Sequence, residues 1–504
     1  MASRSANVGD CLLRPGAADV IAIIDRDGAH TYSALRTATA ALTRQIATWQ
    51  LVPGSRIGLL SRNSLFWAAA YLAILRSGHV AVPFAVTSTP QDILRKARFV
   101  DCTSLLVDSA LARAQEQVTN ALAHVADDTA MPVATGAQGR TGPVHHDDVA
   151  PVDPDDDAAL MFTSGTTSEP RAVRVTHRNI RANTGSIVDY LGLSAQDRML
   201  VVLPFSYCYG ASLLHTHLRV GASLSICDTF AFPETAVETI RRDGCTGIAG
   251  VPSSYQLLLR ASSFAREPLP SLRLMQQAGG RLPQPQLRAV ASAQPHAELF
   301  VMYGATEATS RMSYLPPALL EGRRGSIGQG IPGVTLSVVD DAGRELPAGV
   351  DGEIFARGES IAKGYWNDPA GEAEKFVGGG LRTGDLGHAD EDGFVYLVDR
   401  KADFIKSWGV RVSSREVEDA VVAVPGVTAA AVVGRPDEQA GEAIVAFYTT
   451  ADGADVSTED VLAHCRASLA RPLVPHEARH LAQLPLSTNG KILTAELRTL
   501  ATTP

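Results

Sequence analysis

Apolar residues over roughly the first 300 positions gather in short blocks, and segments with helical spacing separate these blocks. Arg56–Leu60 and Val80–Phe84 have the length and composition of buried strands, and Ser64–Ser77 between them repeats its apolar positions at the helical period. Further strands are predicted at Ala158–Phe162, Met199–Leu203, Ser223–Cys227, Gly247–Val251, Leu272–Gln276 and Glu298–Met302. Such alternation of strands and helices predicts an α/β fold of layered, largely parallel sheets covered by helices.

The pattern changes twice further along the chain. Gly325–Val398 consists of short strands and turns rich in Gly, Pro and Asp, which predicts a small antiparallel, barrel-like region. Beyond Arg400 a helix at Arg415–Ala423, a strand at Ala429–Val433 and a helix at Thr458–Leu469 predict a small α+β domain. We therefore expect a large domain at residues 1–399 and a small C-terminal domain at residues 400–504.

An acidic, turn-rich stretch, Thr135–Asp157, interrupts the strand pattern of the large domain. It contains the run from His145 to Asp148, whose side chains are able to bind a metal. A solvated surface linker explains the same composition, and we favour that interpretation.

Composition narrows the classes of function. The 504 residues exceed one ordinary domain, and 45% hydrophobic with 20% charged residues is typical of a globular protein. A net charge of −9 argues against nucleic-acid binding. The longest apolar run, Leu65–Leu75, has about half the length of a membrane span. Without a recognisable signal peptide, and with six scattered cysteines that lack CxxC spacing, we expect a cytoplasmic protein without disulfides or zinc.

The most informative local segment follows the strand that ends at Phe162. Thr163–Ser168 holds five hydroxyl residues and one glycine, and Pro170 and Arg171 come directly after it. Free backbone N–H groups, hydroxyl donors and a cation together suit a polyphosphate. A Ser/Thr-rich linker is the alternative, and the absence of GxxxxGK[ST] excludes a P-loop ATPase.

This segment resembles the phosphate loop TSGTTGxPKG of the AMP-forming acid–thiol ligases. That superfamily includes acyl- and aryl-CoA synthetases, peptide-synthetase adenylation domains and luciferase. Four more segments resemble motifs of the same superfamily in the same order: Tyr303–Glu307, Thr383–Asp385, Arg400–Val412 and Pro485–Ile492. The resemblance spans essentially the whole chain and implies a C-terminal domain that moves during catalysis.

Some positions depart from the superfamily pattern. The loop has Ser168, Arg171 and Ala172 where the pattern has Gly, Lys and Gly, and Arg171 keeps the positive charge in a bulkier, planar form. The superfamily hinge position, usually Asp or Lys, is Ala402 here, and Asp399 replaces a glycine. We expect the loop to bind phosphate despite these differences, whereas the behaviour of the hinge is the property that the differences are most able to alter.

The resemblance implies how the nucleotide would bind. Tyr303 would lie against the adenine, Asp385 would accept hydrogen bonds from the ribose hydroxyls, and Arg400 would approach the same sugar. The nucleotide-binding residues implied are Thr163, Ser164, Gly165, Thr166, Thr167, Ser168, Arg171, Gly280, Arg281, Tyr303, Gly304, Asp385 and Arg400.

The implied chemistry is attack of a carboxylate on the α-phosphate of ATP, with release of pyrophosphate. Because both reactants are anions, cations must offset their repulsion. Lys491, one of only six lysines, would bridge the carboxylate and the α-phosphate. Glu307 would hold Mg²⁺ and Thr306 would contact phosphate. A solvated lysine in the chain tail is the alternative for Lys491.

In the second implied step the acyl group passes to a thiol, either CoA or the phosphopantetheine of a carrier protein. The C-terminal domain would swing about Ala402, withdrawing Lys491 and bringing in the segment with Lys406 and Gly409. Gly409 would line the thiol channel, where a side chain would obstruct it. A plain turn glycine is the alternative.

The acid pocket is implied to lie at Tyr207, Cys208, Tyr209, Gly250, Gly279 and Gly304. Relatives that activate α-amino acids carry an aspartate where this chain has Cys208. An ammonium group without that partner is unfavourable against apolar walls. We therefore expect an aryl or small hydrophobic acid, although Tyr207 and Tyr209 are equally compatible with a place in the core.

The sequence thus predicts an enzyme that uses ATP and Mg²⁺ to join a small carboxylic acid to a thiol. It does not separate a CoA ligase from a stand-alone adenylation enzyme that loads a carrier protein. A luciferase-like oxygenase and an inactive homologue that binds nucleotide or carrier remain as alternatives. Glu307, Asp385 and Lys491, all present, argue against the inactive homologue.

Overall fold

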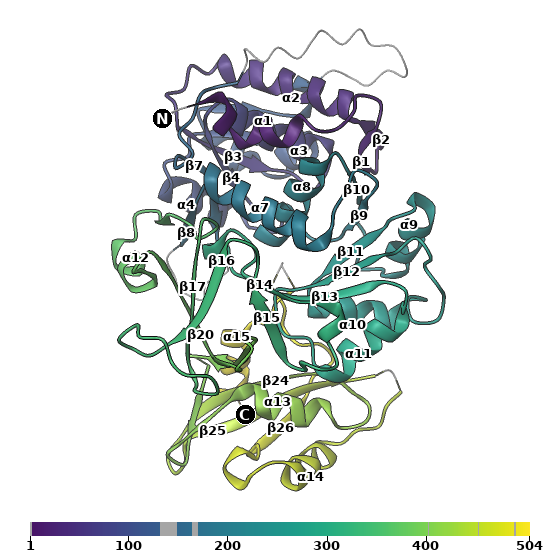
Figure 1. Ribbon diagram of the computed structural model, residues 1–504, viewed down its shortest axis with the longest axis vertical. Helices are drawn as coiled ribbons and strands as arrows, with labels where there is room; N and C mark the ends of the chain where they lie inside the picture. The colour runs from purple at the N-terminus through teal and green to yellow at the C-terminus, as the bar shows by residue number, and fades with distance from the viewer. Residues whose placement is uncertain are drawn as a thin grey trace.

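The computed structural model describes residues 3–131, 149–163, 170–401, 403–451, 453–487 and 490–503. Figure 1 shows a large body that carries the N-terminus and a smaller C-terminal unit beneath it. Two sheets with helices on their faces build the large body, which confirms the predicted α/β class. Of the predicted linker, His145–Asp148 lie outside the described residues, and Val152 pairs with Ser3 just before the next strand.

The first sheet has seven strands in the order β18-β8-β7-β4-β3-β5-β6. Its five strands from β6 to β7 run parallel, whereas β8 and β18 are antiparallel additions at one edge. The bounds are β3 Arg56–Leu60, β4 Val80–Pro83, β5 Ser104–Val107, β6 His124–Ala126, β7 Asp157–Phe162, β8 Ala172–Thr176 and β18 Gly364–Tyr365.

The second sheet has fourteen strands in the order β16-β17-β20-β21-β15-β14-β13-β12-β11-β9-β10-β1-β2, with β19 paired to β20. Its parallel half consists of β1 Ile21–Asp25, β9 Arg198–Val201, β10 Ser223–Ile226, β11 Gly247–Gly250, β12 Leu274–Gln277 and β13 Glu298–Tyr303. The antiparallel strands are β2 Gly28–Thr31, β14 Ser313–Leu315, β15 Ser326–Gly330, β16 Val334–Val339, β17 Gly352–Gly358, β19 Phe376–Val377, β20 Gly380–Ala389 and β21 Val395–Arg400.

The region predicted to be barrel-like is antiparallel, as expected, and it continues the large sheet. The connection arises because β15 pairs with β14 on one side and with β21 on the other. Residues from β20 and β21 therefore lie on the same sheet as the end of β13. This continuity brings distant sequence motifs to one place.

Helices cover both faces of the parallel part of each sheet. One core joins the two sheets through α1 Val8–Leu13, α2 Tyr32–Ala47, α3 Leu65–Arg76, α7 His177–Leu191 and α8 Cys208–Val220. The outer faces carry α4 Pro90–Phe99, α5 Ser109–Ala114 and α6 Glu116–Ala121 on one sheet, and α9 Glu234–Asp243, α10 Pro252–Ala261 and α11 Gln284–Ala293 on the other. The short helix α12 is Pro369–Lys375.

Helix α3 shows why the sequence folds this way. It is apolar on all sides, and it is buried on all sides because it lies between the two sheets. Its ends follow capping rules: the Ser64 hydroxyl accepts a hydrogen bond from the N–H of Trp67. None of the helices in the described ranges is long and apolar enough to cross a membrane.

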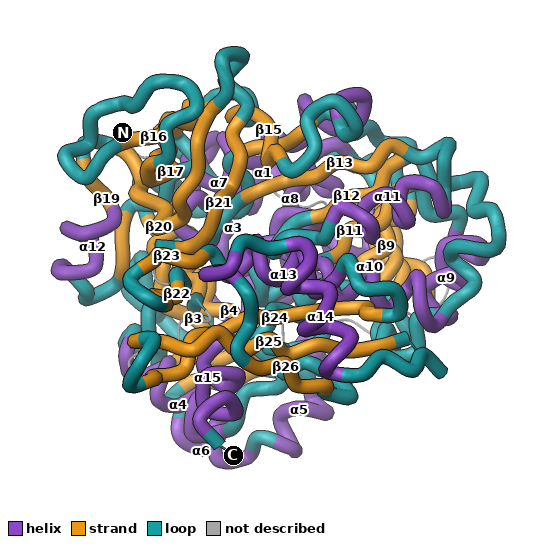
Figure 2. Tube along the Cα trace, turned by 90° about the horizontal axis from the view of Figure 1, so that it is seen from below, coloured by secondary structure: helices purple, strands orange, loops and turns teal. Residues whose placement is uncertain are grey.

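The C-terminal unit holds a five-stranded sheet, β23-β22-β25-β24 with β26 beside β25. Two helices pack on one face of this sheet and a third on the other, as Figure 2 shows from below. The elements are β22 Ile405–Ser407, β23 Val410–Val412, α13 Ser414–Val422, β24 Val427–Asp437, β25 Gly441–Thr450, α14 Thr458–Ser468, β26 Glu477–His480 and α15 Thr494–Thr502. The large sheet ends at Arg400 and the small one begins at Ile405.

Candidate active site

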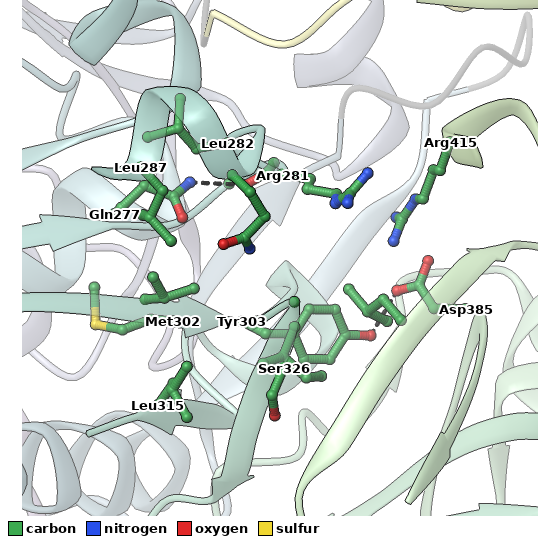
Figure 3. Close-up of a pocket in the computed structure, with 18 of the residues that line it drawn as sticks. Gln277, Arg281, Leu282, Leu287, Met302, Tyr303, Leu315, Ser326, Asp385 and Arg415 are labelled. Atoms are coloured by element: carbon green, nitrogen blue, oxygen red, sulfur yellow. Dashed lines mark hydrogen bonds between the residues drawn. The ribbon is translucent and has the colours of Figure 1, made fainter. Parts of the chain in front are cut away.

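A pocket lies where the C-terminal unit meets the carboxyl ends of β12 and β13. Its empty volume is about 890 Å³, part of which is open to solvent. Figure 3 shows the side chains of Tyr303 and Asp385 on one side and Arg281 and Arg415 on another. The predicted site residues that line it are Gly279, Gly280, Arg281, Tyr303, Gly304, Asp385, Arg400 and Lys491. The ends of parallel strands are where α/β folds usually bind ligands.

Tyr303, Asp385 and Arg400 form a connected polar edge of this pocket. The Tyr303 hydroxyl donates to one carboxylate oxygen of Asp385 at 2.5 Å, and Arg400 Nε donates to the other at 3.1 Å. Asp385 raises the pKa of Arg400, and burial raises the pKa of Tyr303 far above its usual range. The carboxylate is thus held in one orientation beside an aromatic ring, an arrangement that suits a ribose next to a purine.

Lys491 is the one pocket residue contributed by the C-terminal tail. Ser487 N–H donates to the Lys491 carbonyl at 2.7 Å, and Lys491 N–H donates to Ser487 Oγ at 3.1 Å, so these two residues are held together. Gly490, directly before Lys491, has φ +73°, and its carbonyl accepts from Ser253 Oγ of α10 at 3.1 Å. Lys491 Nζ lies 5.6 Å from the centre of the Tyr207 ring, and burial lowers the pKa of this amine.

Glu307 is positioned by residues that the sequence did not single out. Tyr365 of β18 donates from its hydroxyl to Glu307 Oε1 at 2.8 Å. The Arg171 guanidinium lies 4.9 Å from the centre of the Tyr365 ring, and its Nε donates to Asp368 at 3.1 Å. Arg171 is therefore linked to Glu307 through Tyr365. No motif marks Tyr365 or Asp368 in the sequence, because they are distant from both partners along the chain.

The phosphate loop is described only at its two ends. Thr163 N–H donates to the Arg171 carbonyl at 3.1 Å, which holds these ends together. Ser164, Gly165, Thr166, Thr167 and Ser168 lie outside the described residues.

The carboxylates near the pocket fit a magnesium ion whose other ligands come mainly from a bound nucleotide. Within the described ranges, no three His, Cys, Asp or Glu side chains gather around one point. Glu307 is a single carboxylate on the 3-10 turn Thr306–Ala308 that follows β13. Mg²⁺ in nucleotide sites takes one or two carboxylates and completes its shell with phosphate oxygens and water. Glu307 is suited to that mode of binding.

Known families match the chain over most of its length. The family model described as AMP-binding enzyme matches residues 15–366, and the model of the AMP-binding enzyme C-terminal domain matches residues 416–491. The chain belongs to the AMP-binding enzymes. It is an AMP-forming acid–CoA ligase of the adenylate-forming superfamily predicted from the motifs.

Individual relatives agree with this assignment. A 2-succinylbenzoate–CoA ligase of Bacillus cytotoxicus is 29% identical, with 96% of both chains covered. A 4-coumarate–CoA ligase 2 of Oryza sativa subsp. japonica is 31% identical over 88% of this chain and 83% of its own. ATP-bound MatB from Rhodopseudomonas palustris superposes with a TM-score of 0.88 at 25% identity, covering 99% of each chain.

One solved relative carries the reaction intermediate. The o-succinylbenzoate CoA synthetase MenE of Bacillus subtilis, in complex with the acyl-adenylate OSB-AMP, superposes with a TM-score of 0.84 at 26% identity. The superposition covers 99% of this chain and 98% of that one.

The predicted acid wall divides into two groups of residues. Tyr207 and Cys208 stand at the start of α8, and Thr306 Oγ1 donates to Cys208 Sγ at 3.4 Å. Gly279 has φ +83°, and a Cβ there would come within 3.2 Å of the Tyr207 hydroxyl. Tyr207, Cys208 and Gly279 therefore lie together beside Lys491.

Tyr209 takes the core position that the sequence left open as an alternative, and Gly250 lies apart from the pocket that contains Lys491. Tyr209 is 1% exposed and donates from its hydroxyl to the Gln276 carbonyl at 2.9 Å, so it belongs to the core beneath the wall. Gly250 is packed against α10, where a Cβ would come within 2.9 Å of Ser254. Neither lines the pocket that contains Lys491.

The predicted thiol-channel residues lie apart from the pocket in this arrangement of the ligase. Lys406 is exposed on β22, and Gly409, with φ +74°, faces open space. Neither of them lines the pocket. The predicted hinge, Ala402, lies outside the described residues.

Arg281 joins the two units. Its guanidinium donates to both carboxylate oxygens of Asp419 on α13, at 2.8 and 2.6 Å. The residue also lines the pocket, as predicted, but its charge is turned to the C-terminal unit. In this position it is one of several contacts, with Ser253–Gly490 and Gln286–Thr428, between the two units in the orientation that brings Lys491 to the pocket.

Proposed function

We propose that this ligase uses Mg²⁺ and ATP to convert a small carboxylic acid, preferably one with an aryl group, into its acyl-adenylate, and then transfers the acyl group to the thiol of CoA. The observation that carries the proposal is Lys491. A partly buried amine from the C-terminal unit stands at the wall formed by Tyr207 and Cys208, next to the pocket that holds Asp385.

In the first step a carboxylate oxygen bonds to the α-phosphorus of ATP as the bond to pyrophosphate breaks. Lys491 places a positive charge between the two anions, where it offsets their repulsion and the charge that develops in the transition state. Asp385, oriented by Tyr303 and Arg400, holds the ribose and so fixes the α-phosphate relative to Lys491. Magnesium, held at Glu307, would neutralise charge on the phosphates.

The preference for an aryl group rests on the wall and on the relatives. Tyr207 presents an aromatic surface beside Lys491, and Cys208 offers a small, weakly polar one. Burial raises the pKa of Cys208, so its thiol stays neutral near pH 7. Relatives named for 2-succinylbenzoate, 4-coumarate, indoleacetate and feruloyl substrates all act on acids that contain an aromatic ring.

In the second step the sulfur of the thiol attacks the acyl carbon and AMP leaves. We propose that the C-terminal unit rotates near Ala402, residue 400 being the first of the moving part, so that Lys491 leaves and the Lys406–Gly409 segment approaches. CoA is preferred over the phosphopantetheine of a carrier protein because the relatives named above are CoA ligases or synthases.

A screen of acids tests this function. Pyrophosphate release would be followed with benzoate, phenylacetate, 4-coumarate, short aliphatic acids and α-amino acids, each with and without CoA. We expect AMP and pyrophosphate in equal amounts, aryl acids among the best substrates, and a CoA thioester as product. Stoichiometric ADP would refute adenylation. Transfer only to a phosphopantetheinylated carrier would identify a carrier-loading enzyme, and ATP binding without turnover of any acid would identify an inactive homologue.

A further inference from the structure

A buried arginine under the acid wall has no carboxylate partner in the part of the chain that the structure describes. Arg311 follows the 3-10 turn after β13 and is 1% exposed. Its Nη1 donates to Ser310 Oγ at 2.5 Å, whereas Nε and Nη2 have no hydrogen-bond partner among the described residues. Its guanidinium lies 3.7 Å from the centre of the Tyr209 ring.

A buried guanidinium in this arrangement is unfavourable unless a further group accepts hydrogen bonds from Nε and Nη2. Burial of an unpaired charge is strongly unfavourable, and buried polar groups in native proteins nearly always have partners. The Tyr209 ring face attracts the positive charge of the guanidinium, but it does not provide an in-plane acceptor for the N–H groups of Nε and Nη2. The hydroxyls of Tyr190 and Tyr209 also interact with Arg311, but neither accepts a well-aligned hydrogen bond from Nε or Nη2. These neighbouring nitrogens of the planar guanidinium therefore lack an acceptor among the described residues.

The backbone of Arg311 is held firmly in this place. Asn183 of α7 donates to the Arg311 carbonyl at 2.8 Å and accepts from its N–H at 3.4 Å. Gly304, at the end of β13, packs so closely that a Cβ would lie 1.8 Å from the Ser310 carbonyl oxygen. The side chain is thus directed to the start of α8 by the fold itself.

Arg311 faces the same wall as Lys491, from the other side. Burial raises the pKa values of Tyr207 and Cys208, and the positive charge of Arg311 acts against this rise at both residues. Lys491 acts on Cys208 in the same sense. Cys208 therefore lies within the field of two cations, one from the C-terminal tail and one from the core.

A second buried polar side chain lies in the same region. Gln276 of β12 is 1% exposed, and both its Oε1 and Nε2 lack partners among the described residues. Side chains alternate along β12, so Gln276 shares the sheet face of Leu274, which packs in the same core as Tyr209. The Gln276 carbonyl accepts the Tyr209 hydroxyl. The Arg311 guanidinium and the Gln276 backbone thus contact the same tyrosine.

We propose that the acid substrate carries a second anionic group, a distal carboxylate, which binds Arg311 while the reacting carboxylate lies at Lys491. Nε and Nη2 together match the two oxygens of a carboxylate, the geometry in which arginine binds most selectively. Gln276 Nε2 supplies a further donor. The inference rests on the proposed function and narrows its substrate class to dicarboxylic acids.

The wild-type enzyme provides the first test. Acid-dependent ATP–pyrophosphate exchange would be measured for dicarboxylates and for their matched monoacids, such as each benzenedicarboxylate isomer against the corresponding methylbenzoate, and succinate and glutarate against butyrate and valerate. We expect at least one diacid to exceed its partner in kcat/KM by about 100-fold or more. Equal or better use of all the monoacids would overturn the inference and leave the proposed function intact.

Arg311→Met tests the residue itself. This variant keeps the length of the side chain and removes its charge and donors. We expect kcat/KM for the best diacid to fall about 100-fold, that for the matched monoacid to stay equal or rise, and the KM for ATP to remain unchanged. Arg344→Met, at an exposed arginine, is the matched control. An equal loss for both acids would assign Arg311 a purely structural role.

Ligand binding, measured without turnover, distinguishes failure of the dicarboxylate inference from failure of the proposed ligase function. The best diacid should raise the unfolding midpoint of the wild type and of Arg344→Met, but not that of Arg311→Met, while ATP should stabilise all three. If no acid, mono or di, supports exchange although ATP stabilises the protein, the proposed function fails. If Arg311→Met does not fold, the preference of the wild type still decides the question.

Discussion

Lys491 enters the pocket as a partly buried amine that forms no ion pair with a carboxylate in the described ranges. Its lowered pKa has the same cause as its function, because a site that removes water from a cation also strengthens that cation's attraction for phosphate and carboxylate. Binding of both anions reverses the effect and favours the charged form. The amine is therefore poised to gain its partners only when both substrates are present.

Replacement of this amine should stop the first step. We expect Lys491→Ala to lower acid-dependent pyrophosphate exchange by about 10²–10³-fold, the range for loss of one strong transition-state contact. Ile492→Ala, at the exposed neighbouring residue, is the control and should remain near wild type. Exchange by Lys491→Ala at the wild-type rate would remove this residue from the mechanism.

His177 makes the stability of the large domain depend on pH. Burial lowers its pKa to about 4, and its Nδ1 accepts a hydrogen bond from the Val8 N–H at 3.2 Å, which requires the neutral ring. The unfolded chain takes up this proton near pH 6.5 and the folded chain only near pH 4. The free energy of unfolding must therefore fall as the pH drops from about 6.5 to 4, by about 2 kcal/mol at pH 5 from this one group.

Unfolding midpoints at pH 7 and pH 5 measure this dependence. Between pH 7 and pH 5, the unfolding midpoints of the wild type and of His296→Gln, which alters an exposed histidine, should fall by the same amount. The midpoint of His177→Gln should fall less over the same pH range, whatever its value at pH 7. Identical losses in all three proteins would contradict the assignment to His177.

At the scale of elements, the apolar pattern predicts most strands to within one or two residues, because β3, β10 and β11 are buried blocks bounded by turns. The pattern does not predict that β15 joins two regions into one sheet, since that depends on pairing between strands far apart in the chain. The pattern also does not predict which side of α8 faces the active site. This helix is buried around nearly its whole circumference, so the sequence does not tell that Tyr207 faces Lys491 while Tyr209 faces the core.

Motifs predict the site unevenly for a similar reason. Tyr303, Asp385, Arg400 and Lys491 are recognisable from local motifs, and the fold brings all four to one pocket. Arg311, Gln276 and Tyr365 belong to no motif. Their role depends on partners that are absent or distant in sequence, and only the three-dimensional structure reveals them.

Helix α13 should influence only the first half-reaction. Its Asp419 binds Arg281 in the orientation that places Lys491 in the pocket. Both side chains are partly exposed, so the contact contributes little, about 0.5–1 kcal/mol. We expect Asp419→Asn to slow adenylation about two- to five-fold and to leave thioester formation from a preformed adenylate unchanged. Glu416→Gln on the same helix is the control, and an equal effect on both steps would refute this role of α13.

At the scale of the whole molecule, Lys491 and Gly409 belong to the same C-terminal unit but lie in different surroundings. Lys491 lines the pocket, whereas Gly409 faces open space. One rigid unit is therefore able to present either residue to the active site, but only by changing its orientation. The two half-reactions should consequently respond to different substitutions.

Gly409→Leu tests this alternation. Adenylation should stay nearly intact, and thioester formation should fall strongly because the side chain would fill the channel that we propose for the thiol. Gly409→Ala shares the backbone strain of a side chain at φ +74° but is smaller, so it should have a weaker effect on the second step. The measurement pairs pyrophosphate exchange with thioester yield on one preparation. Equal loss in both assays would exclude alternation.

The most direct test of the central claim, attack of the acid on the α-phosphate of ATP, follows an oxygen atom. The best acid would be labelled with ¹⁸O in both carboxylate oxygens and converted with ATP and CoA, and the AMP and pyrophosphate would be analysed by mass spectrometry. Because the carboxylate oxygen that bonds to phosphorus leaves with AMP, we predict one ¹⁸O in each AMP and none in pyrophosphate. Unlabelled AMP, or label in phosphate accompanied by ADP, would contradict the account.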